Sequence, residues 1–188
     1  MHWIDPKALP QTRGVINTLI YNPHGELDGF VLDGERLVHV PPHLGRRIAR
    51  AARPGAQVEV RGIKPRDAEL VAAVSVQVDG RVFDDDGPDG HHPPPAPSAR
   101  PADVVGSVRL TLFAPRGEVC GALLDDGTIV RLHPRGNESL ADCFERGRRI
   151  EVWGPAFRKA GARVVEVEHV ALVAEDEAQA QDFADSRP

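Results

Sequence analysis

The stretch GVINTLIYNPHGELDGFVLDGERLVHVPPH, residues 14–43, decides the fold because the chain repeats it as GSVRLTLFAPRGEVCGALLDDGTIVRLHPR, residues 106–135. The two copies align without a gap at an offset of 92 residues, and the match continues to Gly62 in the first copy and Gly154 in the second. A repeated unit of this length can enclose its own core. The fold of one copy therefore predicts the fold of the other.

The first half of each copy has the pattern of three short strands. Ile16, Thr18 and Ile20 alternate with residues of the opposite face, which is typical of a half-buried strand. Pro and Gly in the segment NPHGE predict a hairpin turn before the second strand. Asp33 and Gly34 predict another turn after that strand. The third strand then places Val38 towards the core and His39 outward.

A short helix is expected after the third strand. Leu44, Ile48 and Ala52 recur at helical spacing before Gly55, and the second copy repeats this pattern before Gly147. Two further strands complete each copy, so the predicted order is β, β, β, α, β, β. These last strands are expected at residues 57–61 and 70–78 in the first copy and at 148–153 and 163–170 in the second.

Five strands with one helix between the third and the fourth resemble the oligonucleotide/oligosaccharide-binding (OB) fold, a small Greek-key barrel. An SH3-like barrel is the main rival, but a helix of about three turns at this place favours the OB fold. The segments NPHGELDGFVL (22–32) and LVHVPPH (37–43) also look like bacterial proteins of unknown role that are described as OB-fold and nucleic-acid-binding-like. The resemblance implies an all-β protein of two tandem five-stranded OB-like barrels, each with one short helix between strands 3 and 4.

The sequence divides into five segments. Prolines and acidic residues in GRVFDDDGPDGHHPPPAPSARPADV predict a flexible linker and a loosely set orientation of the two barrels. The expected segments are an N-terminal extension (1–12), a first OB-like repeat (13–79), the linker (80–104), a second OB-like repeat (105–173) and an acidic tail (174–188).

Composition and charge limit the function. A net charge of −5 means that any nucleic-acid binding must come from a local basic patch. The start of the chain lacks the pattern of a signal peptide, and no apolar stretch is long enough to span a membrane, so a cytoplasmic protein without membrane contact is expected. Cys120 and Cys143 lack CxxC or Cys/His spacing, which is typical of buried or idle thiols.

Three positions keep a basic side chain in both copies. His24 and Arg116 lie in the loop between strands one and two, His39 and Arg131 on strand three, and His43 and Arg135 just past it. These elements border the groove that OB folds use for ligands. Tyr21, Phe113 and Trp153 could stack on bases nearby. The alternative is a solvated barrel rim for the basic residues and core packing for the aromatic ones. The expected ligand-binding residues are His24, His39, His43, Arg116, Arg131, Arg135, Tyr21, Phe113 and Trp153.

No motif for catalysis is present. The sequence contains no nucleophile with a base partner, no phosphate-binding glycine loop and no zinc signature, so no enzyme, no catalytic residue and no cofactor is expected. His39 and His43 are separated by two prolines, and arginines stand at the matching positions of the second copy. Because arginine cannot ligate a metal, no metal site is expected either.

The sequence thus predicts a non-enzymatic binding module. Its expected partner is single-stranded nucleic acid or another anionic ligand, held on the outer face of strands two and three by electrostatic and stacking contacts. The alternative is a protein-interaction or architectural module that uses the same barrel face.

Overall fold

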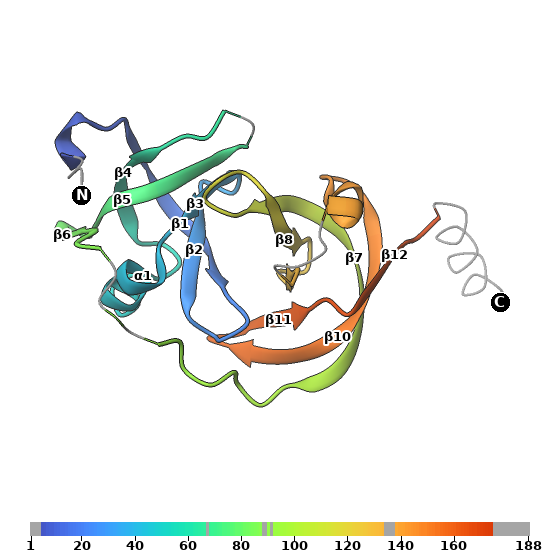
Figure 1. The fold of residues 1–188 in the computed structure, drawn as a ribbon. Coiled ribbons are helices and arrows are strands. Elements are labelled where there is room, and N and C mark those ends of the chain that lie inside the picture. Colours follow the sequence, from blue (N-terminus) through green and yellow to red (C-terminus); the bar gives the residue numbers. More distant parts are fainter. Residues whose placement is uncertain (1–4, 67, 88–89, 91, 134–137, 175–188) are drawn as a thin grey trace, which may run out of the picture.

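The structure is a computed structural model that describes residues 5–66, 68–87, 90, 92–133 and 138–174. Two β-barrels lie side by side, and the chain between them passes along the lower side of the molecule in Figure 1. No helix among these residues has both the length and the apolar character needed to cross a membrane.

The first barrel is a closed sheet. Its strands are arranged in the order β3-β2-β1-β4-β5, and a parallel pairing of β3 with β5 closes the ring. The strands are β1 (Gln11–Tyr21), β2 (Leu27–Leu32), β3 (Arg36–His39), β4 (Gln57–Ile63) and β5 (Leu70–Val78). A short 3₁₀ helix, η1 (Pro6–Ala8), precedes β1, and β6 (Arg81–Asp84) pairs with the edge of β5.

The second barrel repeats this arrangement. A parallel pairing of β9 with β11 closes it, and the fifth strand of the fold is divided into two parts that both pair with β10. The strands are β7 (Arg100–Phe113), β8 (Val119–Leu124), β9 (Ile129–Arg131), β10 (Arg149–Lys159), β11 (Ala162–Glu166) and β12 (His169–Leu172). Five antiparallel-dominated strands closed by a contact between the third and the fifth form the OB barrel. The prediction of two tandem OB-like barrels is therefore confirmed.

The predicted helices are found in different forms. In the first barrel, α1 (Pro42–Ile48) follows β3 and buries Leu44 and Ile48 completely. In the second barrel the equivalent place holds a 3₁₀ helix, η2 (Glu138–Phe144), so the expectation of an equivalent helix in each barrel is wrong in this detail. A physical difference is that Phe144 is fully buried whereas Leu140 is only half-buried, so the apolar face is shorter.

Register shifts in β1 and β7 change which face of the strand each side chain occupies. The register of β1 against β2 shifts between Ile16 and Thr18, and β7 against β8 shifts between Val108 and Leu110. Such a bulge changes which side chains point to a given face. Val108 accordingly belongs to the core of the second barrel, whereas Leu110 belongs to the apolar cluster of the first barrel.

The two barrels share an apolar interface. The cluster that contains the core of the first barrel also contains five buried residues of the second, which are Leu110, Leu112, Leu123, Ile129 and Val164. The remaining buried residues of the second barrel form a separate core. One barrel therefore covers an outer face of the other, which disagrees with the loosely set orientation expected from the linker.

Part of the expected linker is structured. β6 and the first residues of β7 fall within 80–104, and the segment after β6 contacts α1. Arg47 donates hydrogen bonds of 2.7 Å to the Asp84 carbonyl and to the Asp86 carboxylate. The flexibility of the rest of the linker stays a prediction, and residues 175–188 of the expected acidic tail lie outside the described residues.

Candidate ligand-binding cleft between the barrels

The second and third strands of both barrels are buried on both faces. Val31 and Leu37 point out of the first barrel, yet they are 0% and 3% exposed. Leu123 and Ile129 occupy the equivalent positions in the second barrel and are fully buried. The predicted binding face, the outer face of strands two and three, is thus covered by the other barrel at these positions.

The turns of the two barrels dock in a reciprocal manner. Gly25, in the β1–β2 turn, approaches both the connecting segment and β10, since a Cβ added there would lie 3.2 Å from Pro97, 3.6 Å from the Phe157 ring and 3.9 Å from Lys159. Gly117, in the β7–β8 turn, approaches Ala68 in the β4–β5 loop at 3.7 Å by the same measure. Each turn therefore approaches the region of the other barrel at or after the end of its fourth strand, as in an interface with twofold symmetry.

A cleft of about 530 Å³ opens where these faces separate. The 92-residue offset relates Asp28 to Cys120 and His39 to Arg131, so equivalent positions of the two copies meet here. Apolar residues form much of the wall, and polar residues lie at the floor and the mouth. The lining residues are Pro23, Asp28, His39, Ala114, Pro115, Arg116, Glu118, Val119, Cys120, Arg131 and Leu132.

An ion pair between the barrels forms the floor of the cleft. Arg131 donates a hydrogen bond of 2.7 Å from Nη2 to Oδ2 of Asp28, and the two side chains are only 11% and 12% exposed. The other carboxylate oxygen of Asp28 lies 3.9 Å from Nδ1 of His39. A charge-assisted bond at this distance holds the two barrels together and fixes the guanidinium.

Burial sets the charge of the neighbouring groups. Burial lowers the pKa of His39, Asp28 opposes this shift and Arg131 adds to it, so the imidazole is neutral at pH 7. Burial also raises the pKa of the Cys120 thiol, which keeps it protonated. With one carboxylate and one guanidinium, the floor of the cleft carries no net charge.

Basic side chains without carboxylate partners lie beside the cleft on the second barrel. Arg116 is exposed at the mouth, in the β7–β8 turn. Arg158 and Arg163 are direct cross-strand neighbours on β10 and β11, and Arg100 of β7 pairs with Ala156 two residues before Arg158. We call Arg100, Arg158 and Arg163 the basic edge. These three and Arg116 form no ion pair with another described residue. The same is true of Arg50 and Arg81 of the first barrel, whereas Arg13, Arg36, Arg46, Arg47, Arg53 and Arg61 do form ion pairs.

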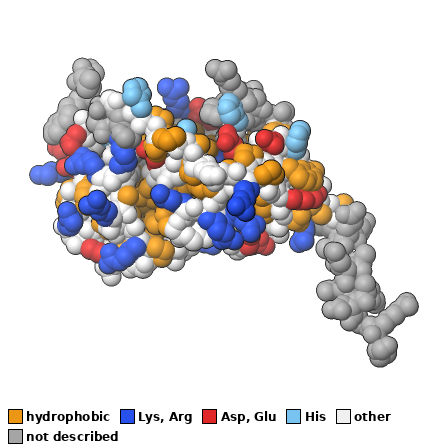
Figure 2. Space-filling view, turned by 90° about the horizontal axis from the view of Figure 1, so that it is seen from below, with side chains coloured by type: hydrophobic (Ala, Val, Ile, Leu, Met, Phe, Trp, Pro, Cys, Tyr) orange, Lys and Arg blue, Asp and Glu red, His pale blue; other side chains and the backbone are white. Residues whose placement is uncertain are grey.

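Figure 2 views the side of the molecule that carries β10 and β11. Lys and Arg side chains gather there in several groups, with Asp and Glu side chains between them. The basic character of this side is therefore local, which agrees with the negative net charge of the whole chain.

The cleft brings together three of the predicted ligand-binding residues, His39, Arg116 and Arg131. His24 is exposed in the β1–β2 turn, where its backbone N–H donates to Oδ1 of Asn22 at 2.9 Å, and it does not line the cleft. His43 lies on α1, where its Nε2 contacts the carboxylate of Asp85. Arg135 lies outside the described residues.

The predicted aromatic residues also lie outside the lining of the cleft. Tyr21 is 7% exposed within the core of the first barrel, where burial raises the pKa of its phenol. Phe113 is half-buried against the cluster shared by the barrels. Trp153 borders a shallow hollow on β10 together with Asp103 and Glu168, whose carboxylates would repel phosphate. Their stacking role therefore stays a prediction.

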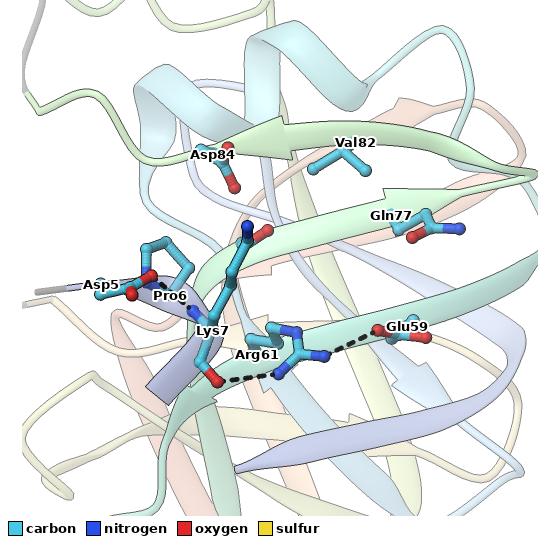
Figure 3. Close-up of a pocket in the computed structure, with 9 residues that line it drawn as sticks. Asp5, Pro6, Lys7, Glu59, Arg61, Gln77, Val82 and Asp84 are labelled. Atoms are coloured by element: carbon cyan, nitrogen blue, oxygen red, sulfur yellow. Dashed lines mark hydrogen bonds and ion pairs between the residues drawn. The ribbon is translucent and has the colours of Figure 1, made fainter. Parts of the chain in front are cut away.

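A larger hollow, of about 680 Å³, lies over β4, β5 and β6 beside η1. Figure 3 shows Lys7, Arg61 and Glu59 on its wall. Arg61 donates to the Lys7 carbonyl at 3.3 Å and to the Glu59 carboxylate at 3.5 Å. Because Arg61 is already engaged by these groups, this hollow is a weaker candidate for an anion than the side with Arg116 and the basic edge.

Eight of the residues that line the cleft were not among the predicted ligand-binding residues, and those with ionisable side chains are Asp28, Glu118 and Cys120. A signal for their position exists in the sequence. Phe30, Val31 and Leu32 are consecutive apolar residues, as are the equivalent residues 122–124, and such runs indicate a strand that is buried on both faces. The residues next to such a run therefore border an interface.

No family model matches the chain, and no curated protein matches it. Among solved structures, the wild-type single-stranded DNA binding protein from Thermus aquaticus aligns at 14% identity and a TM-score of 0.29 over 88% of this chain and 92% of that chain. A deletion mutant of that protein aligns at 15% identity and a TM-score of 0.29 over 88% and 94%. These scores are too low to support a function, and the fold follows from the strand pairings. By its strand order, the chain is a tandem OB-fold protein.

Proposed function

We propose that this protein is a non-enzymatic module that binds single-stranded nucleic acid along the basic edge and the mouth of the inter-barrel cleft. The observation that supports this most is the cross-strand pair Arg158 and Arg163. Like charges directly opposite each other destabilise a hairpin. Arg158 donates to the Gly161 carbonyl at 3.4 Å, and neither arginine forms an ion pair with another described residue. An anionic partner would remove this cost.

The arrangement suits a polyanion better than a single small anion. Arg100 extends the basic edge onto β7, and Lys159 continues it towards the β1–β2 turn. Pro23, in that same turn, lines the cleft together with Arg116. A backbone with regularly spaced phosphates can contact the basic edge and Arg116 in succession.

The cleft favours a single strand over a duplex. Its walls include Pro23, Ala114, Pro115, Val119 and Leu132, which offer apolar contact to an unstacked base. The bases of a duplex are stacked and paired, so they could not enter. In this proposal the main contact with the nucleic acid is made by Arg116 and the basic edge and not by the outer faces of strands two and three. His39 and Arg131 still contribute to the binding site, at the floor of the cleft.

Salt dependence tests the proposal. Fluorescence anisotropy with a labelled single strand of about ten nucleotides should show binding that weakens as salt rises from about 0.05 M to about 0.2 M. Changing Arg158→Ala and Arg163→Ala together should weaken binding and reduce the logarithmic salt slope by about 1.4, because two phosphate contacts are lost.

A matched control is the double change Arg50→Ala and Arg81→Ala, which removes the same charge from exposed positions of the first barrel. This variant should bind like the wild type. Equal losses in both double variants would contradict the proposed surface. Absence of wild-type binding at low salt would refute nucleic-acid binding and favour the protein-interaction alternative.

A further inference from the structure

We infer that the inter-barrel cleft is a binding site for a nucleobase that carries one phosphate, with the ring between the apolar walls and the phosphate at Arg116. This inference rests on the proposed function and names the chemical group that the cleft takes. The group has two sources: a free nucleoside monophosphate or one nucleotide of a bound strand.

The walls of the cleft suit a flat, uncharged ring. Pro23 comes from the first barrel, and Ala114, Pro115, Val119 and Leu132 come from the second, so the ring would lie between the two barrels. A cleft of about 530 Å³ with mainly apolar walls and a few convergent polar groups is typical of a small-molecule site. The walls provide contact area without selecting a charge.

The floor supplies hydrogen bonds without net charge. Arg131 has one N–H directed to Asp28, which leaves further guanidinium donors on a side chain that lines the cleft. Asp28 and the neutral His39 ring provide acceptors. Guanidinium and carboxylate groups are among the side-chain groups that form hydrogen bonds to the edges of bases. A charged ligand group would instead meet an ion pair that is already neutralised.

The mouth of the cleft suits one phosphate. Arg116 is exposed there and has no ion pair with another described residue. Glu118, also exposed at the mouth, would repel additional phosphates of the same nucleotide. A monophosphate is therefore expected to bind better than a triphosphate.

Calorimetry with the full chain can separate the parts of the ligand. The probes are the four common nucleoside 5′-monophosphates, the corresponding nucleosides, ribose 5-phosphate and a short single-stranded oligonucleotide. At least one monophosphate should bind about tenfold or more tightly than ribose 5-phosphate. Arg116→Ala should weaken the monophosphate but not its nucleoside, because only the phosphate contacts this side chain.

Ala114→Phe places a large side chain in the cleft, and Ala171→Phe makes the same change at an exposed position of β12. The first should weaken monophosphate binding by about tenfold or more, and the second should leave it unchanged. Thermal unfolding of both variants checks that they fold. If Ala114→Phe does not fold, the Arg116→Ala variant still tests the inference, because it should weaken the binding of the nucleotide but not that of the nucleoside.

The outcomes separate this inference from the proposed function. Oligonucleotide binding that depends on the basic edge but is unchanged in Ala114→Phe, without binding of any monophosphate, would overturn the inference and leave the proposed function intact. Monophosphate binding that Ala114→Phe abolishes, without oligonucleotide binding, would support the cleft as a site for a free nucleotide and refute the proposed function. Equal binding of ribose 5-phosphate and all monophosphates would overturn the inference.

Discussion

The ion pair between Asp28 and Arg131 should contribute strongly to the stability of the two-barrel unit. Asp28→Ala removes the carboxylate that lies 2.7 Å from the guanidinium and leaves a charged side chain that is only 11% exposed. Leaving one charge of a fully buried pair without its partner costs about 3–5 kcal/mol. Because Arg131 still reaches the cleft, we expect the lower end of this range, a loss of about 3 kcal/mol in the free energy of unfolding.

Urea unfolding followed by circular dichroism measures this change. A matched control is Glu35→Ala, because Glu35 forms a second ion pair between the barrels, with Arg146 at 3.6 Å, and these side chains are 76% and 63% exposed. Exposed pairs contribute about 0–1 kcal/mol, so the control should be close to the wild type. The double variant Asp28→Leu with Arg131→Met should be more stable than Asp28→Ala, since it leaves no buried charge.

Two results would refute this reasoning. If Asp28→Ala cost no more than Glu35→Ala, the pair would not be buried between the barrels in solution. If the double variant were less stable than Asp28→Ala by several kcal/mol, specific packing rather than charge compensation would explain the effect.

Three further predictions test separate parts of the structure. Burial lowers the pKa of His39 below its ordinary 6.5, so the unfolded chain takes up this proton first as the pH falls. The contribution of His39 to stability should therefore be fully present above about pH 6.5 and decrease below it. Urea unfolding at several pH values should show a weaker decrease for His39→Gln. Gly121→Ala would place a Cβ 1.9 Å from the Val130 carbonyl and should lower the free energy of unfolding by about 1–3 kcal/mol. In Gly106→Ala the new Cβ meets only side chains, at 3.0 Å or more, so a smaller loss is expected. Thermal unfolding of both variants measures the difference. Limited proteolysis should cut first at the exposed residues 92–96, and mass spectrometry showing faster cleavage within either barrel would contradict the unit boundaries.

The repeat allowed much of the fold to be predicted. Each strand inferred in one copy could be checked in the other, and alternation correctly placed Val38 in the core and His39 outside it. Helix type was less certain from sequence, because α1 and η2 have similar apolar spacing but differ in how much of it they bury. Local patterns could not reveal this difference, since it depends on contacts with the rest of each barrel.

The site was harder to predict because it depends on contacts between distant segments. Asp28 and Arg131 are 103 positions apart, and nothing in either local sequence indicates that they meet. The basic edge depends on a two-residue turn in which Ala160 and Gly161 both have positive φ, at 48° and 88°, which sets the pairing of the flanking arginines. Alanine is unusual in such a turn, so this turn could not be predicted from the local residues.

The expected acid response of the histidines also changes with the structure. Unperturbed histidines would gain charge as the pH falls towards about 6 and would add to anion binding. Burial lowers the pKa of His39, so this side chain gains charge only at a lower pH than an unperturbed histidine and contributes less to anion binding as the pH falls. Only the structure shows that His39 lies between the barrels.

The most direct test of the account is a titration of isotope-labelled protein with a single strand of about ten nucleotides, followed by two-dimensional NMR of the backbone and arginine side chains. We expect the largest shifts at Arg158, Arg163, Arg100 and Arg116 and at residues lining the cleft. Shifts concentrated on the outer face of β4, β5 and β6, or no shifts at low salt, would contradict it.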